Sequence, residues 1–415
     1  WCCAVAIHGC GSDSTHHAAR ESAGDAGSDG GEPPGNGGEG GNGGEGGEGG
    51  EGNSGPATTG GAGDQGTGGA APDGDADTSL TAGQNGSAGA GEAVAPTVVA
   101  TLDYVPLSLA LDGANLYVTV GSQSNIDGKV QTVAKTAVGA TEAAGGGITT
   151  LAPGLNGPET IAVEGGSVYW SGNNGAIFAV PTAGGTVTNV TAVGVYVNIA
   201  GYNRIAIATN GLYAPIGNLG SIAAFPLAGA AASAGQVIYP SVAGSTIFGL
   251  DSDGTSVFFL VNISPFPGGS NEVDLAQVAV GGGAVTTLAK NVALGQMYDD
   301  YLIHDATTIY WTEQATGNVY SVPKTGGTPK VLATALTYCT CSPDIVVDGN
   351  NIYALLPFAL VRFPKTGGTP VTLASTQGGS ADSYHVGGGS VALAVDDTYV
   401  YWLYEGHGQI LKIPK

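Results

Sequence analysis

One motif occurs seven times between residue 96 and the end of the sequence, and it constrains the fold more than any other feature. Each copy has an apolar triplet, a turn that usually holds a carboxylate, and an aliphatic–aromatic pair, as in Ile161–Glu164 and Val168–Trp170. The aromatic residues that mark the copies are 52, 44, 45, 52, 43 and 48 residues apart, and they are Tyr117, Tyr169, Tyr213, Phe258, Tyr310, Tyr353 and Tyr401. A period of this length indicates an array of one supersecondary unit.

Each copy predicts four antiparallel strands. The triplet and the aromatic pair form the first two, and a third, alternating segment such as Asn318–Pro323 follows. Paired glycines, such as Gly326 and Gly327, then supply the positive φ of a tight hairpin before a fourth segment, Lys330–Ala333. Four antiparallel strands in about 46 residues are typical of a β-propeller blade, and a closed ring of blades protects the sheet edges.

The two ends of the repeat region predict how the ring closes. The seventh copy reaches Lys415 after its third strand, whereas Pro96–Leu102 precedes the first copy and has the composition of a fourth strand. Pairing of this segment with Gln409–Pro414 would complete the last blade, which a solenoid would not need. We therefore expect an all-β domain, residues 96–415, that forms a β-propeller of seven four-stranded blades closed by an N-terminal strand. Six or eight blades are the alternatives if a divergent copy has been miscounted.

Composition separates this domain from the segment before it. Residues 21–95 contain 28 glycines and 13 carboxylates but no Lys or Arg, so they cannot bury enough apolar surface to offset the loss of backbone entropy. We expect a disordered Gly/Glu-rich linker there. The whole chain has 34 acidic and 11 basic residues, which argues against nucleic acid and anionic membrane surfaces as partners.

Residues 1–20 are typical of the end of an export signal. Trp1–Ile7 is apolar, and Ile7-His8-Gly9-Cys10 resembles the lipobox of bacterial lipoproteins, in which the cysteine carries the lipid. The resemblance implies lipidation of Cys10, and Gly11 implies sorting to the outer membrane. The location that follows is the bacterial cell envelope, with membrane contact only through the lipid anchor. A plain secretory signal with an incidental cysteine, and hence a secreted protein, is the alternative.

Two segments of the domain resemble known propellers. Tyr310-Trp311-Thr312-Glu313 is similar to the YWTD signature of low-density-lipoprotein-receptor-type propellers, which normally have six blades. Val322–Pro329 looks like the corresponding segment of propeller lipoproteins of myxobacterial type. The resemblance covers residues 96–415 and implies residues that pack the blade, without a catalytic residue.

Several recurring or unusual residues have both a structural and a functional interpretation. A carboxylate lies five residues before the marker aromatic in six copies, which indicates a capped hairpin turn; a ring of metal ligands is the alternative. Trp170, Trp311 and Trp402 are expected to pack between blades, and a carbohydrate-stacking platform is the alternative. His304 replaces an aliphatic residue of the repeat, so it is a candidate functional residue or a histidine satisfied within the sheet.

Cysteines and catalytic motifs give few chemical signals. In an exported protein we expect Cys339 and Cys341 to form a local disulfide, which requires a turn. Free thiols, other partners, and a metal or redox role are the alternatives. The domain has no second cysteine pair to complete a zinc site and no motif of a nucleophile elbow, metalloprotease or phosphate loop. We therefore predict no catalytic residue, metal or cofactor.

The segments that cross from one blade to the next differ among the copies and are polar. Variation on a regular scaffold is where binding usually occurs. We predict a shallow acidic and aromatic binding face that contains Glu159, Arg204, Asp299, Asp300 and Asp344. The competing interpretation is that these residues only cap strand ends.

The function that follows is a tethered, monomeric propeller that binds a protein or a glycan without catalysis. One alternative is a propeller enzyme, similar to lyases or lactonases, that uses a metal in the channel. Another is a purely structural component of the envelope.

Overall fold

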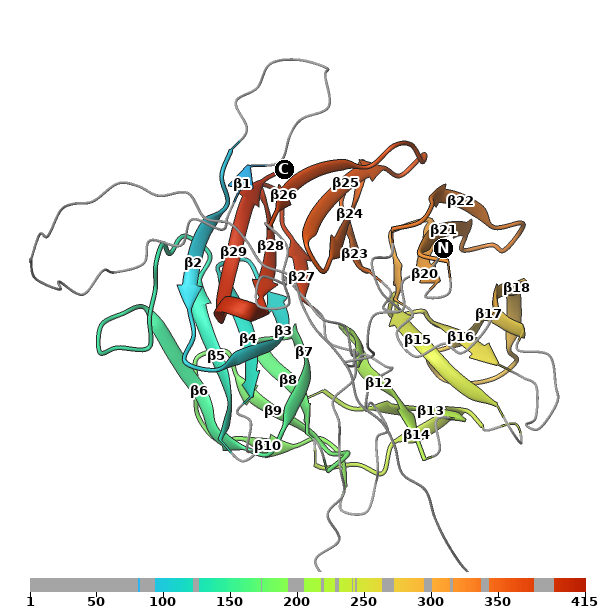
Figure 1. Ribbon diagram of the computed structural model, residues 1–415. Helices are drawn as coiled ribbons and strands as arrows, with labels where there is room; N and C mark the ends of the chain where they lie inside the picture. The colour runs from blue at the N-terminus through green and yellow to red at the C-terminus, as the bar shows by residue number, and fades with distance from the viewer. Residues whose placement is uncertain are drawn as a thin grey trace, which may run out of the picture. The chain divides into compact units, whose positions relative to one another are not determined.

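The computed structural model describes residues 81–82, 94–121, 127–172, 174–192, 205–217, 220–227, 231–240, 242, 245–262, 272–294, 301–313, 316–336, 343–376 and 392–415. These residues form seven antiparallel sheets arranged in a ring (Figure 1). The first strands of neighbouring sheets contact one another all the way round, so they are the innermost strands. In this part of the chain, no helix has the length and apolar character needed to cross a membrane.

The seven sheets follow the seven copies of the repeat, and we number them as blades 1 to 7 in chain order. From the innermost strand outwards, blades 1 to 4 are β3 (Val105–Leu111), β4 (Asn115–Gly121), β5 (Gly128–Ala134), β6 (Ile148–Leu155); β7 (Pro158–Glu164), β8 (Ser167–Gly172), β9 (Ile177–Pro181), β10 (Thr188–Asn189); β11 (Ala206–Ala208), β12 (Gly211–Ile216), β13 (Ser221–Phe225), β14 (Gln236–Tyr239); and β15 (Thr246–Ser252), β16 (Ser256–Asn262), β17 (Glu272–Ala279), β18 (Thr286–Leu294).

Blades 5 to 7 follow the same order, and a short strand is added to blade 6. They are β19 (Leu302–His304), β20 (Thr308–Glu313), β21 (Asn318–Pro323), β22 (Lys330–Ala333); β23 (Asp344–Val347), β24 (Asn351–Leu356), β25 (Ala359–Pro364), β26 (Val371–Ser375), with β1 (Thr81–Ala82) outside it; and β27 (Leu393–Val395), β28 (Tyr399–Tyr404), β29 (Gln409–Pro414), β2 (Thr97–Thr101). A short 3-10 helix, η2 (Glu405–His407), joins β28 and β29.

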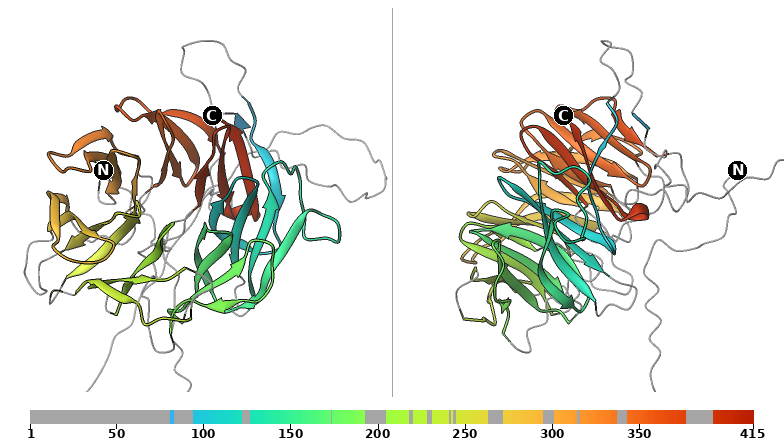
Figure 2. Two further views of the ribbon diagram at one scale, coloured as in Figure 1. Left: turned by 180° about the vertical axis from the view of Figure 1, so that it is seen from behind. Right: turned by 90° about the vertical axis from the view of Figure 1, so that its left-hand side faces the viewer.

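The predicted all-β propeller of seven four-stranded blades is therefore confirmed. The second strand of each blade is apolar almost throughout, and the five central residues of β4 are buried. A strand needs this composition when its sheet is covered on both faces, and here the neighbouring blades cover both faces. In the side view of Figure 2 the blades lie face to face.

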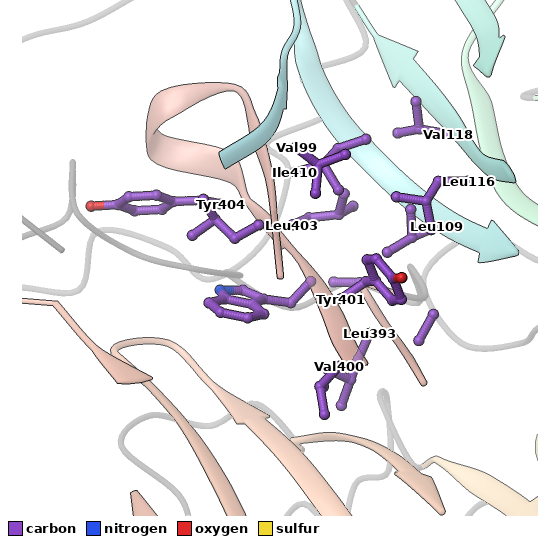
Figure 3. Close-up of a cluster of buried hydrophobic side chains, with 14 of the residues drawn as sticks. Val99, Leu109, Leu116, Val118, Leu393, Val400, Tyr401, Leu403, Tyr404 and Ile410 are labelled. Carbon is purple, nitrogen blue, oxygen red and sulfur yellow. The ribbon is translucent and has the colours of Figure 1, made fainter. Parts of the chain in front are cut away.

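The predicted closure of the ring is also confirmed. β2 pairs antiparallel with β29, with Thr97 opposite Lys412 and Thr101 opposite Gln409. Val99 of β2 and Ile410 of β29 are fully buried together with Leu109 of blade 1, as Figure 3 shows. The strand that precedes the repeats thus joins the last blade to the first through a common core.

Five of the six carboxylates that lie five residues before the marker aromatics cap turns, as the structural interpretation predicted; the exception is Glu164 of blade 2. In blade 5, Oδ1 of Asp305 accepts hydrogen bonds from the backbone N–H groups of Thr307 and Thr308, at 2.9 Å each. The hydroxyl of Tyr310 donates to Oδ2 of the same carboxylate at 2.8 Å. The same arrangement recurs at the three pairs Asp112–Tyr117, Asp348–Tyr353 and Asp396–Tyr401.

The paired glycines are required both by their backbone angles and by a close contact. Gly326 and Gly327 have φ values of 83° and 142°, a region that favours glycine. The N–H of Gly327 donates to the carbonyl of Leu288 in β18 of the preceding blade, at 3.0 Å. A Cβ on Gly326 would lie 2.8 Å from that same carbonyl oxygen. The hairpin between the third and fourth strands therefore also packs one blade onto the one before it.

The tryptophans pack inside the ring, so the alternative of a carbohydrate-stacking platform is wrong. Trp170, Trp311 and Trp402 are at most 1% exposed, and a buried ring cannot stack on a sugar. Trp311 stacks on Tyr320, with ring centroids 5.5 Å apart, and its Nε1 donates to the carbonyl of Val292 in the preceding blade at 3.4 Å. The YWTD-like segment thus serves blade packing, as the resemblance implied.

Candidate functional site

The predicted binding residues that the structure describes belong to the ends of the innermost strands where the chain enters each blade, which we call the crossing ends. The opposite ends, where the aspartates cap turns, are the turn ends. The structure describes two of the five predicted residues, Glu159 in β7 and Asp344 in β23. The other three, Arg204, Asp299 and Asp300, lie outside the described residues, as do Cys10, Cys339 and Cys341.

Glu159 is held by its backbone, whereas its side chain is not bonded to the described structure. The hydroxyl of Thr119 in blade 1 donates to the backbone carbonyl of Glu159 at 2.7 Å. The carboxylate has no hydrogen-bond or ion-pair partner among the described residues, and burial raises its pKa above the ordinary value. Every other described carboxyl group with a resolved shift has a lowered pKa.

Buried hydroxyl groups without partners lie beside Glu159 in the same blade. Thr160 and Ser171 are 2% and 0% exposed, and neither side-chain oxygen has a hydrogen-bond partner in the described part of the chain. The pairing of β7 with β8 is irregular here, because Pro158 is opposite Gly172 whereas Ile161 is opposite Trp170. Irregular strand pairing is common beside functional sites, where it changes the direction of a side chain. Buried polar atoms without hydrogen-bond partners call for an explanation such as a bound ligand or water.

Asp344 makes a structural contact at the same end of the ring. It is 1% exposed, and its Oδ2 accepts a hydrogen bond from the backbone N–H of Ala392 in blade 7 at 2.7 Å. Ser108 has the equivalent position in blade 1, and its hydroxyl accepts from the N–H of Ile161 in blade 2 at 3.2 Å. Asp344 therefore joins two innermost strands, and a role in binding stays a prediction.

The turn ends contain ion pairs between blades that the sequence analysis missed. A lysine that follows the third strand of one blade binds the turn aspartate of the blade before it, at 2.6 to 3.0 Å; the pairs are Lys324–Asp253, Lys365–Asp305, Lys415–Asp348 and Lys135–Asp396. The sequence does contain a signal for these ion pairs, because each of the four lysines directly follows the end of a third strand. These pairs join blades 4, 5, 6, 7 and 1 in succession.

The turn-end contacts shift the pKa values of the aspartates downwards. Burial is the largest single influence and would raise the pKa of Asp253, but Lys324 and the backbone N–H groups of the turn together lower it to about 2. The pKa values of Asp348 and Asp396 are likewise about 2, because their turn N–H groups and lysines outweigh the opposing effect of burial. Burial and the hydrogen bond to Asp348 raise the pKa of Tyr353 to about 12.

His304 and Asp251 form a polar pair on the innermost strands, and the sequence analysis named only His304 as a candidate. Nδ1 of His304 in blade 5 lies 2.7 Å from Oδ2 of Asp251 in blade 4. Asp251 is opposite the marker Phe258, where the other six blades have Ala, Ile or Val. Two departures from the repeat therefore meet across one blade interface, and aligning the copies by strand pairing would have revealed Asp251.

The described residues do not form a recognisable metal centre. Within them, no three or more His, Cys, Asp or Glu side chains gather closely enough to hold a metal ion. The turn aspartates of blades 1, 4, 5, 6 and 7 are bonded to their own turns, as the structural interpretation predicted.

No family model matches the chain, and no curated protein matches it in sequence. Among solved structures, a nidogen–laminin complex is 14% identical over 63% of this chain and 76% of its own, with a TM-score of 0.34. BamB from Moraxella catarrhalis is 13% identical over 77% and 85%, with a TM-score of 0.44. PorZ, a surface component of the type-IX secretion system of Porphyromonas gingivalis, is 14% identical over 77% and 37%, with a TM-score of 0.47. The fold assignment therefore rests on the strand pairing of this chain.

Proposed function

We propose that this protein is a non-catalytic binding module that presents the crossing ends of its innermost strands to a protein or a glycan. The observation that carries the proposal is the carboxylate of Glu159, which is partly buried, has a raised pKa and has no partner among the described residues. Burying a polar group without a hydrogen bond costs free energy. A ligand that donates a hydroxyl, amide or ammonium group would recover that free energy.

Other residues at the crossing ends fit the same site. Asp300 is two residues before Leu302, which pairs with Trp311, and Glu159 is two residues before Ile161, which pairs with Trp170. The two acids therefore precede the paired residue by the same number of positions in the sequence. Arg204, Asp299, Asp300 and Asp344 complete the proposed binding face with Glu159.

The proposed cellular setting follows from the segments before the domain. The lipobox-like sequence that ends at Cys10 supports a lipid anchor in the outer membrane, and residues 21–95 would serve as a tether. We propose a monomer in the cell envelope, with Cys339 and Cys341 joined in a local disulfide. A secreted protein and a structural envelope component are the alternatives.

A propeller enzyme is the second candidate, and the Asp251–His304 pair favours it. A carboxylate at Nδ1 orients an imidazole so that Nε2 can act as a base or a metal ligand. Metal analysis of the purified protein distinguishes the two candidates. A stoichiometric divalent metal that His304→Ala removes would favour the enzyme.

The binding proposal is tested with the full chain and two variants on glycan arrays and in crosslinking with envelope extracts. We expect Glu159→Gln to lose at least about tenfold in affinity for the ligand found, equivalent to about 1.4 kcal/mol. Glu164→Gln, at the turn end of the same strand, is the matched control and should bind like the parent. Equal binding by all three proteins would remove Glu159 from the site and overturn the proposal.

A further inference from the structure

The outer edges of several blades are covered by the hairpin of the following blade. Leu288 in blade 4 accepts a hydrogen bond from Gly327 of blade 5, and Leu332 in blade 5 accepts one from Gly368 of blade 6, at 3.2 Å. Val98, in the outermost strand of blade 7, accepts one from Gly139 of blade 1 at 2.9 Å. An uncovered edge would present unpaired N–H and C=O groups to other strands.

Blade 6 differs because of the way the ring closes. The following blade is blade 7, whose third and fourth strands, β29 and β2, come from the two ends of the domain. No hairpin connects them, so blade 7 has no glycine turn to place against Leu373, which has the position of Leu288 and Leu332. β26 contains no charged residue that would protect an open edge, such as Lys290 of β18 or Lys330 of β22. The outermost strands β2, β6, β10 and β14 also contain none, so the missing hairpin is what distinguishes blade 6.

This edge is where a fifth strand is added. Thr81 of β1 pairs antiparallel with Ser375 of β26, and Ala82 pairs with Ala374; Figure 1 shows β1 beside β26. The composition of the linker agrees with this pairing. Residues 78–91 contain no carboxylate, and Leu80 is the one large aliphatic residue between positions 21 and 93. The part of the linker best suited to form a strand is therefore the part that precedes and includes β1.

We propose that the outer edge of β26 is a strand-addition site for an extended, uncharged peptide, and that the chain's own β1 segment occupies it. In strand addition the backbone hydrogen bonds supply the affinity, and the lack of charge on both strands sets the class of peptide. The linker is then fixed to the domain at β1 as well as at β2. The free tether consequently ends near residue 80 instead of residue 95. This proposal does not depend on the binding function assigned to the crossing ends.

Hydrogen exchange of the full-length protein tests the occupied edge. Proline cannot donate to a ladder, so Thr81→Pro with Ala82→Pro should release β1. We expect exchange in residues 371–376 to accelerate at least about tenfold, while exchange in residues 330–333 of β22 stays unchanged. The matched control is Ser87→Pro with Ala88→Pro, in the same linker but outside β1. Unchanged exchange in both double variants would overturn the proposal.

A peptide competition experiment tests the class of ligand. The probe is a fluorescein-labelled synthetic peptide of residues 78–87, which contains no charged side chain, and the measurement is fluorescence polarisation. We expect it to bind the Thr81→Pro/Ala82→Pro protein at least about tenfold more tightly than the parent, because the parent's edge is occupied. Equal binding to both proteins would contradict an edge held by the chain itself. A parent dimer that the double variant converts to a monomer would instead show exchange of β1 between two copies.

Discussion

The innermost strands of this propeller have different surroundings at their two ends. At the turn ends, the same aspartate recurs in one blade after another, and it is bonded to its turn, a tyrosine and often a lysine of the next blade. At the crossing ends, the two described acids have different surroundings: Asp344 accepts a hydrogen bond from a neighbouring strand, whereas Glu159 has no described partner. The repeated polar residues therefore hold the ring together, and the residues that depart from the repeat are the ones for which we propose a binding role.

Low pH should have the largest effect on the stability of the protein, because it neutralises the turn-end aspartates together. The folded pKa values of Asp253, Asp348 and Asp396 are about 2, below the ordinary 3.8. Their contribution to stability is therefore present above pH 4 and is lost as the pH falls from about 4 to about 2. We expect the melting temperature to be steady near neutral pH and to fall steeply across that window. Asp396→Asn should flatten the fall, and an identical acid profile would contradict this account.

Removal of a single turn cap should have the next largest effect. Asp305→Ala removes two backbone hydrogen bonds, the Tyr310 contact and the ion pair with Lys365. We expect a loss of about 3 kcal/mol in the free energy of unfolding, measured by urea denaturation. Glu164→Ala is the matched control in blade 2, because Glu164 has no side-chain partner among the described residues, and it should cost less than about 1 kcal/mol. Equal losses would mean that the caps do not stabilise the ring.

The strands and the turn caps could be predicted because they depend on local patterns, and the closure because Pro96–Leu102 has the composition of a fourth strand without a copy of its own. Alternation and paired glycines act within one blade, and an aspartate caps a turn two or three residues away. The Lys324–Asp253 pair could not be predicted from a local pattern, since its residues are 71 positions apart. They meet only because blade 5 packs against blade 4 in the folded ring. The contact between Asp251 and His304, 53 positions apart, could not be predicted for the same reason, although His304 itself was a candidate. The geometry of the crossing ends depends on segments outside the repeat, so the sequence could name candidate residues there without arranging them.

The glycine hairpins allow a sharper test of packing between blades at the turn ends. Gly326→Ala would place a Cβ 2.8 Å from the carbonyl oxygen of Leu288 and would require a φ of 83° for alanine. We expect a loss of about 2 kcal/mol in stability. Gly281→Ala is the matched control in blade 4, because nothing lies within 4 Å of its Cβ and its φ lies outside the positive region. A Gly326→Ala protein as stable as the control would show that the hairpin can move away from β18.

Glu159→Gln should have the smallest effect on stability and the opposite sign from the turn-end variants. Burial raises the pKa of Glu159 above its ordinary 4.5, so folding disfavours the ionised form. The penalty is absent below pH 4.5 and appears as the pH rises through the folded pKa. We therefore expect Glu159→Gln to be more stable than the parent at pH 7, by less than about 1 kcal/mol, and equally stable near pH 4. A less stable variant at pH 7 would give Glu159 a structural role like that of Asp344. A more stable variant with weakened ligand binding would mean that the chain keeps an unfavourable carboxylate because its ligand needs it.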